Sequence, residues 1–280
     1  MSQESLTPES VPRADGMAML GIGTWQNEAP DQCAESVRTA LEMGYRHVDT
    51  ARFYGNEEHV GEGIAAADVP REDAFLASKI HPEAEGAAYN EVYEGIEKSL
   101  SLLEVDALDL LYIHWPVGNY EAEETLAAFA DLVDDGLVRH VGVSNFDRAL
   151  VEEALEVLDV PLFANQVERH PLLPQEDLVA HAQGHDYDLV AYSPLGRGDA
   201  LSLPAVEAVA EKHGVSPAQA CLAWVTHPEN VVAIPKATGE GHLRDNLGAA
   251  DLELDAEDVE RIDGVDRRER FVEREGAPWR

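Results

Sequence analysis

A series of polar and aromatic side chains follows short apolar runs along this 280-residue chain. Lysine is scarce, with four residues among 20 basic ones, yet two of the four stand at the ends of such runs. A buried lysine acts as a compact point charge that tunes the pKa of a neighbour, a role that arginine fills poorly. Chemistry that depends on a tuned pKa is therefore expected among Asp49, Ser78, Lys79, His114, Trp115, Ser144, Asn145, Asn165, Gln166, Tyr192, Ser193 and Lys236.

Each of these residues has an ordinary structural explanation when it is taken alone. A single histidine is usually a hydrogen-bonded structural residue, and a lysine at a strand end is usually solvated. Seven such strand ends with polar or aromatic groups are harder to attribute to chance. In a parallel barrel the carboxyl ends of the strands meet at one rim, where the active site lies.

The elements that would position these side chains alternate between two patterns. Eight apolar runs predict strands at Met19–Thr24, His47–Thr50, Ala74–Ile80, Leu108–His114, Arg139–Ser144, Leu162–Val167, Asp188–Ser193 and Val231–Pro235. Periodic patterns predict helices at Gln32–Met43, Ala88–Leu103, Glu123–Asp135, Ala149–Leu158, Gln175–His181, Pro204–His213, Pro217–Trp224, Gly241–Ala249 and Ala256–Val265. Glycines where a left-handed helix cap is wanted follow three of them, at Gly44, Gly136 and Gly214. Eight such units predict an α/β fold, a (β/α)8 TIM barrel whose parallel strands close on themselves.

The alternative architecture is an open, doubly wound sheet. That fold would be favoured by a GxGxxG sequence after the first strand, and the nearest match, Gly196-Arg197-Gly198, lacks the third glycine. No linker or change in composition divides the chain, so we expect a single domain over residues 1–280. Residues 266–280 form a charged tail that either frays or, as we predict, folds over the barrel mouth after the extra C-terminal helix.

The charge balance is extreme, with 55 acidic residues against 20 basic ones and a net charge of −35. Such a surface repels phosphate backbones and anionic lipids, so nucleic-acid and membrane binding are poor hypotheses. Self-repulsion also destabilises a compact chain unless salt screens it. We interpret the composition as adaptation to a high-salt cytoplasm, as in a halophilic archaeon; an acidic protein from an ordinary cytoplasm is the alternative.

The cysteine content and the apolar runs indicate a cytoplasmic protein. Cys33 and Cys221 are the only cysteines, which is too few for a disulfide framework. The longest apolar runs are far shorter than the ~20 residues of a membrane span. The polar, acidic start at Met1–Asp15 does not resemble a signal peptide.

At its strand ends the sequence resembles the aldo-keto reductases. Each motif is weak by itself, but together and in order they are specific. They are Leu20-Gly21-Ile22-Gly23-Thr24-Trp25, Asp49-Thr50-Ala51 with Tyr54-Gly55-Asn56-Glu57, Lys79, His114-Trp115-Pro116, Gly142-Val143-Ser144-Asn145-Phe146, Asn165-Gln166-Val167, Tyr192-Ser193-Pro194-Leu195-Gly196 and Ile234-Pro235-Lys236.

The resemblance implies a catalytic centre of Tyr54, Asp49, Lys79 and His114 that reduces an aldehyde or ketone with NADPH or NADH. Tyr54 would protonate the carbonyl oxygen. A free tyrosine has a pKa of about 10, which the ammonium of Lys79 is expected to lower. Asp49 would keep Lys79 charged and in place, and His114 would orient the carbonyl and stabilise charge on its oxygen. Without the other three residues, Tyr54 would be interpreted as a tyrosine that packs in a loop after the second strand.

The resemblance also implies the cofactor contacts. Tyr192 would stack on the nicotinamide, and Asn145 and Gln166 would bind its carboxamide, with Ser144 nearby. Further along the barrel mouth, the resemblance assigns Ser193, Leu195 and Gly196 to the pyrophosphate, and Lys236, His242, Asp245 and Asn246 to the adenosine end.

One departure from the family pattern bears on the choice of cofactor. Members specific for NADPH carry a serine or threonine next to the lysine and an arginine six residues beyond it. Ala237 and His242 occupy these positions here. A guanidinium binds a phosphate better than an imidazole that is mostly neutral at pH ~7. We therefore expect good use of both cofactors, with Arg244 as a possible substitute for the missing arginine.

The substrate is less well defined by the sequence. Trp25 and Trp115, with Trp279 as a further candidate, are expected to form an aromatic wall around a small carbonyl compound, beside His114. Arg197 or a tail arginine such as Arg270 could receive a carboxylate, although a surface position is the more ordinary explanation for each. Monomer is the usual state in the family, and we expect it here.

Other functions are less well supported. Some relatives of this fold act as cofactor-binding regulatory subunits, but this chain keeps all four catalytic groups. A barrel aldolase would need Lys79 as a neutral amine, which Asp49 opposes. His181 and His185 are four residues apart, but Gly184 weakens that helix and no third ligand is evident, so we expect a surface pair and no metal site.

Overall fold

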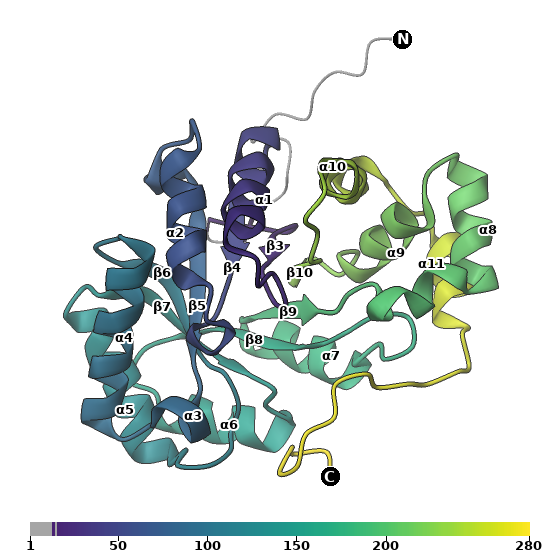
Figure 1. The fold of residues 1–280 in the computed structure, drawn as a ribbon. Helices are drawn as coiled ribbons and strands as arrows, with labels where there is room; N and C mark the ends of the chain where they lie inside the picture. The colour runs from purple at the N-terminus through teal and green to yellow at the C-terminus, as the bar shows by residue number, and fades with distance from the viewer. Residues whose placement is uncertain (1–12, 15) are drawn as a thin grey trace.

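The eight apolar runs form parallel strands in the computed structural model, which describes residues 13–14 and 16–280 (Figure 1). The strands lie side by side in chain order: β3 (Ile22–Gly23), β4 (His47–Asp49), β5 (Phe75–Ile80), β6 (Leu108–Ile113), β7 (Val138–Ser144), β8 (Leu162–Glu168), β9 (Asp188–Tyr192) and β10 (Val231–Ala233). Parallel bridges from Leu20 to Ala233 and from Gly23 to Lys236 join the first strand to the last. The backbone N–H of Gly21 donates to the carbonyl of Ala233 at 2.9 Å. The sheet therefore closes into the predicted (β/α)8 barrel.

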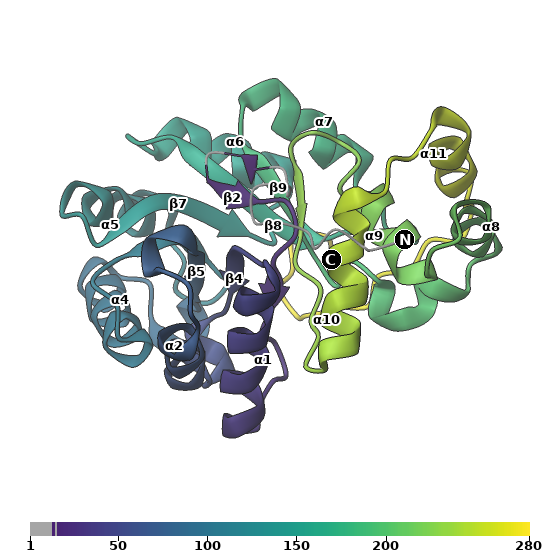
Figure 2. The same ribbon diagram turned by 90° about the horizontal axis from the view of Figure 1, so that it is seen from above.

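Helices surround the strands and cover their outer faces (Figure 2). They are α1 (Pro30–Met43), α2 (Glu57–Ala66), α3 (Pro82–Glu85), α4 (Tyr89–Leu103), α5 (Ala122–Asp134), α6 (Arg148–Val157), α7 (Glu176–His185), α8 (Pro204–His213), α9 (Pro217–Val225), α10 (Glu240–Leu247) and α11 (Ala256–Asp263). Short 3-10 turns are η1 (Arg52–Tyr54), η2 (Arg71–Asp73), η3 (Gly196–Ser202) and η4 (Gly248–Asp251). The apolar stripe of α4 faces the barrel, since Val92, Ile96 and Leu103 are all buried.

The sequence patterns missed α2 because two glycines lower its helix propensity. Both glycines are needed for close helix packing. A Cβ on Gly61 would lie 2.6 Å from the carbonyl oxygen of Leu103, and one on Gly63 would lie 2.5 Å from that of Ala34. The local cost in propensity is offset by contacts that exist only in the folded chain.

The helix of the two histidines was also misjudged. Helix α7 continues through Gly184 to His185, and His181 is 7% exposed, with Nδ1 3.0 Å from the hydroxyl of Tyr187. The expected surface pair is therefore wrong for His181. Among the residues that the structure describes, no three histidine, cysteine or acidic side chains are grouped to hold a metal ion.

A small hairpin that the patterns did not predict covers the end of the barrel where the strands begin (Figure 2). It pairs β1 (Arg13–Ala14) with β2 (Met17–Ala18) in antiparallel fashion. Met17 is fully buried and packs inside the barrel with Phe75, Leu110 and Val190. This apolar filling leaves the opposite end of the barrel for a polar site.

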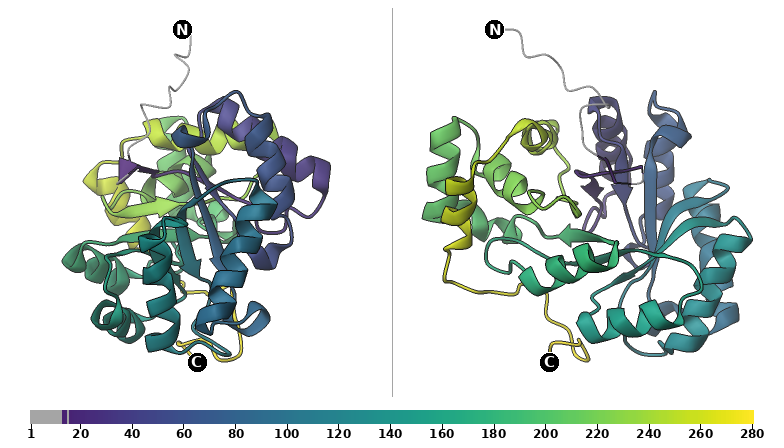
Figure 3. Two further views of the ribbon diagram at one scale, coloured as in Figure 1. Left: turned by 90° about the vertical axis from the view of Figure 1, so that its left-hand side faces the viewer. Right: turned by 180° about the vertical axis from the view of Figure 1, so that it is seen from behind.

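The C-terminal segment lies at that opposite end. From α11 it runs along the molecule to the last residue beside α3 and α6 (Figure 3). Val272, Glu273 and Arg274 line a cavity at the barrel mouth, so the predicted tail over the mouth is confirmed. Cys33 and Cys221 are buried and unpaired, and none of the described helices is long and apolar enough to cross a membrane.

Candidate active site

A cavity of about 300 Å³ opens where the strands end. Its walls come from most of the βα loops and from the C-terminal tail. The lining residues are Gly23, Trp25, Asp49, Phe53, Tyr54, His81, His114, Trp115, Ser144, Asn145, Gln166, Tyr192, Ser193, Arg197, Ile234, Lys236, Val272, Glu273 and Arg274. The structure thus brings most of the predicted site residues to one place.

A buried ion pair forms the floor of this cavity. The ammonium of Lys79 donates to Oδ1 of Asp49 at 2.5 Å and to the carbonyl of Thr50 at 2.7 Å. The side-chain amide of Gln166 donates to the other oxygen of Asp49 at 2.8 Å. Lys79 is fully buried, and burial lowers its pKa while the charge of Asp49 opposes that shift. Such an engaged ammonium is a poor nucleophilic amine, which argues against an aldolase.

Tyr54 stands above the ion pair at the end of η1. Its ring contacts that of Trp25, with centroids 4.8 Å apart, and that of His114, with centroids 5.6 Å apart. The ammonium of Lys79 is 5.2 Å from the centroid of the Tyr54 ring. Gly55 caps the turn with a φ of 68°, a left-handed conformation that suits glycine.

The pKa of Tyr54 is raised well above its ordinary value, contrary to the expected lowering by Lys79. Burial is the largest cause, followed by the negative charge of Asp49 and the proximity of Tyr192. Because Asp49 largely neutralises Lys79, the pair has little net charge with which to favour a phenolate. Tyr54 therefore remains a protonated donor at neutral pH.

His114 follows β6 and is held as a neutral imidazole. Burial lowers its pKa well below the ordinary value, and the positive charge of Lys79 adds to the effect. The side-chain amide of Asn145 donates to the backbone carbonyl of His114 at 3.0 Å, which fixes the start of this loop. A neutral histidine keeps a hydrogen-bond donor without adding a charge to the cavity.

A chain of buried polar side chains holds the loop that carries Tyr54. Thr24 donates its hydroxyl to Thr50 at 2.9 Å, and Thr50 donates to the amide oxygen of Asn56 at 3.1 Å. The amide nitrogen of Asn56 donates to the backbone carbonyl of Thr24 at 2.9 Å, which closes the network. The motifs contained these residues, but their roles as supports of the loop were not predicted.

The residues predicted to bind the nicotinamide form a second polar network. The hydroxyl of Tyr192 donates to the amide oxygen of Asn145 at 2.8 Å, and the amide nitrogen of Asn145 lies 3.1 Å from the hydroxyl of Ser144. Ser144 in turn donates to the carbonyl of Gln166 at 2.9 Å. Asn145 has a φ of 65°, a left-handed conformation that asparagine tolerates better than most residues. A set of amides and hydroxyls around a tyrosine ring fits a flat carboxamide-bearing heterocycle.

The residues predicted for the rest of the dinucleotide do not all reach the cavity. Ser193 lines it, and Lys236 is an exposed cation on its wall. Leu195 and Gly196 lie beside it in the turn that enters η3. The residues on α10 are farther away and are absent from the cavity wall; these are His242, Asp245 and Asn246.

The α10 residues also differ in how free they are to bind. His242 is exposed, whereas Asn246 is buried. Asp245 accepts from the hydroxyl of Ser216 at 2.8 Å and from the side chain of Gln219 at 3.1 Å. Asp245 thus already serves to hold α9 against α10.

The substrate side of the cavity matches the predicted aromatic wall in part. Trp25 is 45% exposed and Trp115 is 7% exposed, and both line the cavity. Trp279 does not line it but supports Trp115, with ring centroids 5.6 Å apart. Arg197 is at the cavity wall, while Arg270 stacks on Trp279 at 3.9 Å instead.

Five lining residues were not individually anticipated: Phe53, His81, Val272, Glu273 and Arg274. Phe53 adjoins the tyrosine in η1, and His81 directly follows β5. Their places next to Tyr54 and two residues after Lys79 were signals that could have identified them. Arg274 pairs with Glu83, and its guanidinium lies 5.5 Å from the ring of Trp115. A tail contact of this kind is not visible in the sequence.

A fully buried carboxylate, Glu168, fastens the tail to the barrel. Its two oxygens accept from the backbone N–H groups of Phe271 at 2.7 Å and Val272 at 3.0 Å, and His170 lies 3.0 Å away. Burial by itself would raise the pKa of Glu168, but these hydrogen bonds lower it below its ordinary value. The ring of Phe271 packs close to Gly196: a Cβ added at Gly196 would lie 3.3 Å from Cε2 of Phe271.

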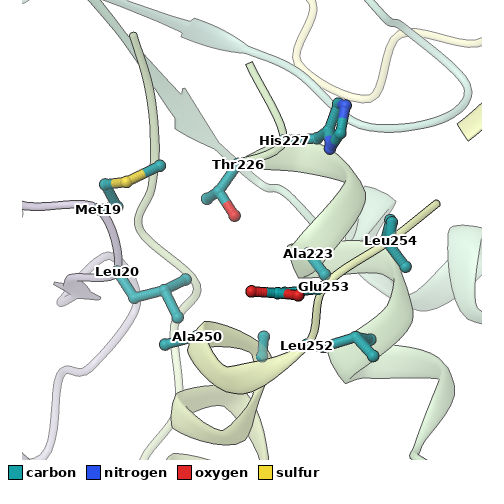
Figure 4. Close-up of a pocket in the computed structure, with 10 residues that line it drawn as sticks. Met19, Leu20, Ala223, Thr226, His227, Ala250, Leu252, Glu253 and Leu254 are labelled. Carbon is teal, nitrogen blue, oxygen red and sulfur yellow. The ribbon is translucent and has the colours of Figure 1, made fainter. Parts of the chain in front are cut away.

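A larger cavity, of about 380 Å³, is unrelated to this site (Figure 4). It lies between the segment before β3 and the chain around η4, and its wall is largely apolar, with Leu20, Leu252 and Leu254. Thr226, His227 and Glu253 are its polar members. None of the predicted site residues contributes to it, so volume alone does not identify the active site.

Comparisons with known proteins agree with this geometry. The model of the Aldo/keto reductase family matches residues 16–267. The chain is 40% identical over 254 residues to glyoxal reductase of Bacillus subtilis, covering 91% of each. It superimposes on an aldo-keto reductase from a Medee basin deep-sea metagenome library with a TM-score of 0.87 and 33% identity, covering 92% of this chain and 94% of that one. A thermostable aldo-keto reductase in complex with the inhibitor epalrestat gives a TM-score of 0.82 and 38% identity, with coverage of 88% and 94%.

Replacing Glu168 with glutamine should release the tail. The amide nitrogen of glutamine cannot accept a hydrogen bond, so at least one of the two backbone donors loses its partner. We expect hydrogen exchange in the peptide 269–280 to become on the order of tenfold to a hundredfold faster. Mass spectrometry of the exchanged protein measures it.

Asp177→Asn removes the same charge from an exposed position and is the matched control. If the tail of Glu168→Gln exchanges at the rate of this control, Glu168 does not fasten it.

Proposed function

The chain belongs to the aldo/keto reductase family, and from this we propose that Tyr54, Lys79, Asp49 and His114 perform its carbonyl reduction. The observation that carries the assignment is the buried ion pair of Lys79 and Asp49 directly below the ring of Tyr54. When bound, the reduced nicotinamide cofactor of the family supplies a hydride to the carbonyl carbon. The side chains of this protein supply the proton, the orientation and the electrostatic environment.

Tyr54 donates the proton to the carbonyl oxygen. Its raised pKa keeps the hydroxyl protonated at neutral pH, which supplies the donor form but makes the proton harder to transfer. The phenolate left behind would be unstable in a buried site, and the ammonium of Lys79 offsets only part of that cost because Asp49 largely neutralises it. Lys79 thus acts after the proton has moved, and Asp49 keeps it in position.

His114 orients the carbonyl. The neutral imidazole donates a hydrogen bond to the carbonyl oxygen, which strengthens as negative charge develops there. An imidazolium would compete with Tyr54 as the proton source, but the lowered pKa of His114 prevents this at neutral pH. The two residues therefore have separate roles.

The cofactor side is assigned to the amide and hydroxyl groups of the second network. Ser144, Asn145 and Gln166 would bind the carboxamide, and the ring of Tyr192 would stack on the nicotinamide. Ser193, Leu195 and Gly196 would follow the pyrophosphate. Lys236, His242, Asp245 and Asn246 would lie at the adenosine end.

The substrate is proposed to be a small carbonyl compound. The cavity of about 300 Å³ has aromatic walls from Trp25 and Trp115, which suit a compact molecule. The similarity to a protein named glyoxal reductase supports the same size class.

Replacing Tyr54 with phenylalanine tests the assignment. The ring and its contacts with Trp25 and His114 remain, but the proton donor is lost, so turnover should fall on the order of 10²- to 10⁴-fold. The measurement is the oxidation of NADPH and NADH by absorbance with methylglyoxal and an aromatic aldehyde.

Tyr93→Phe is the matched control, because the hydroxyl of Tyr93 bonds Asp135 between α4 and α5, away from the cavity. Cofactor affinity, measured by fluorescence, should be unchanged in both variants. Retention of more than about a tenth of the turnover in Tyr54→Phe would exclude this residue as the proton donor.

Both cofactors are proposed to be used with comparable efficiency. Ala237 offers no hydroxyl, and His242 offers an exposed imidazole in place of a guanidinium. Arg244 pairs with Glu240 at 2.7 Å, and both side chains are 67% exposed, so this weak pair does not hold Arg244 away from a phosphate.

We expect the substitution His242→Arg to raise the catalytic efficiency with NADPH relative to that with NADH about tenfold. A hundredfold preference for NADPH in the unaltered protein, about 2.7 kcal/mol, would contradict the proposal.

The acidic surface is proposed to be an adaptation to a high-salt cytoplasm, where one domain spanning residues 1–280 acts as a monomer. The net charge of −35 means that surface carboxylates repel one another. Salt screens this repulsion beyond the Debye length, which is about 10 Å at 0.1 M and about 3 Å at 1 M. The melting temperature should therefore rise steadily with KCl up to molar concentrations, and light scattering in molar KCl should give the mass of one chain. A melting temperature independent of salt would contradict the adaptation.

A further inference from the structure

His81 is a buried histidine in the wall of the active-site cavity that the assigned reaction does not use. It follows β5 directly and stands at the start of α3. Its side chain is 1% exposed, and neither ring nitrogen has a hydrogen-bond partner. Buried polar atoms are nearly always paired in native proteins, so this side chain has an unused capacity to bind a polar group.

The backbone fixes the position of this ring. The N–H of His81 donates to Oε2 of Glu85 at 2.6 Å, and the other oxygen of Glu85 pairs with Arg52 at 3.2 Å. On one side the ring of Phe53 packs against it, with centroids 4.9 Å apart and an angle of 36° between the planes. Phe53 is itself 47% exposed, so this cover over His81 lies between the imidazole and solvent.

The position of His81 relative to the reacting groups is defined by His114. The His114 ring contacts the ring of Tyr54 at 5.6 Å and the ring of His81 at 5.3 Å. With its carbonyl oxygen bound by Tyr54 and His114, a substrate would have its neighbouring carbon in the cavity whose wall includes His81. Substituents on that carbon meet an imidazole and not an apolar wall.

His81 suits an uncharged oxygen. Burial lowers its pKa, and the nearby charge of Arg274 adds to that effect, so the ring is neutral at neutral pH. A neutral imidazole has one donor and one acceptor, which can serve either a carbonyl oxygen or a hydroxyl group. A carboxylate on the substrate would bind better to a guanidinium than to a neutral imidazole. The guanidinium at this wall, that of Arg274, is already paired with Glu83.

We propose that His81 determines substrate specificity by hydrogen-bonding a second oxygen on the carbon next to the reacting carbonyl. The substrate class is then 2-oxoaldehydes and 2-hydroxyaldehydes, in preference to alkyl aldehydes of the same size. An alkyl group in that place leaves the imidazole unpaired, and sites built to bind a polar group discriminate against analogues that lack it. The inference rests on the proposed carbonyl reduction.

The test compares two substrates that differ by one group. Glycolaldehyde and propanal have the same number of heavy atoms, with a hydroxyl in one and a methyl in the other. The ratio of their kcat/KM values, based on free aldehyde, should favour glycolaldehyde in the unaltered protein and fall about tenfold in His81→Phe. His81→Asn, which keeps a donor and an acceptor, should retain part of the preference. Because both substrates are measured in one preparation, loss of folded protein cancels from the ratio.

His59→Phe is the matched control, because this histidine lies on α2 beside Glu62 and does not line the cavity. Its ratio should stay near that of the unaltered protein. An unchanged ratio in His81→Phe, or an equal loss with both aldehydes, overturns the role of His81. Failure of the unaltered protein to oxidise NADPH or NADH with either aldehyde, or with the methylglyoxal and aromatic aldehyde used for Tyr54→Phe, would instead count against the proposed reduction.

Discussion

The ion pair of Lys79 and Asp49 is the interaction on which the site depends. Both groups are withdrawn from water, which costs several kcal/mol for each charge unless geometry and further hydrogen bonds compensate. Here the carbonyl of Thr50 and the amide of Gln166 provide those bonds. The same atoms belong to three strand ends, so the barrel must close correctly before the pair can form.

Burial explains most of the electrostatics around this pair. Tyr54 and His114 both have their pKa values shifted toward the uncharged form, because burial dominates and the nearby charge of Asp49 for Tyr54, and of Lys79 for His114, adds to it. A site whose groups are neutral and whose donors are fixed has little reorganisation to undergo when charge develops.

A second buried carboxylate connects the barrel to its cover. Glu168 bonds the backbone of the tail, and the tail then contributes Val272, Glu273 and Arg274 to the cavity. These contacts bring one cation, Arg274, and one carboxylate, Glu273, to the mouth of a protein with a net charge of −35. Arg197 and Lys236 line the same cavity, so the site is locally suited to an anionic dinucleotide despite the acidic surface.

The sequence by itself determined the barrel and the composition of its rim. Apolar runs and period-3.6 patterns are local properties, and eight alternating units admit few topologies, so the strands and most helices could be predicted. Helix α2 could not, because Gly61 and Gly63 lower its propensity for the sake of contacts with distant helices. The position of each polar residue at a strand end was likewise local information, and it placed Asp49, Lys79 and His114 on one rim.

Only the tertiary structure decided how those groups affect one another. The upward shift of the pKa of Tyr54 arises from burial and from the pairing of Lys79 with Asp49, which are properties of the closed barrel. The contact of Glu168 with Phe271 joins residues 103 positions apart. The unpaired ring of His81 is equally invisible in the sequence, because whether a polar atom finds a partner depends on every element packed around it.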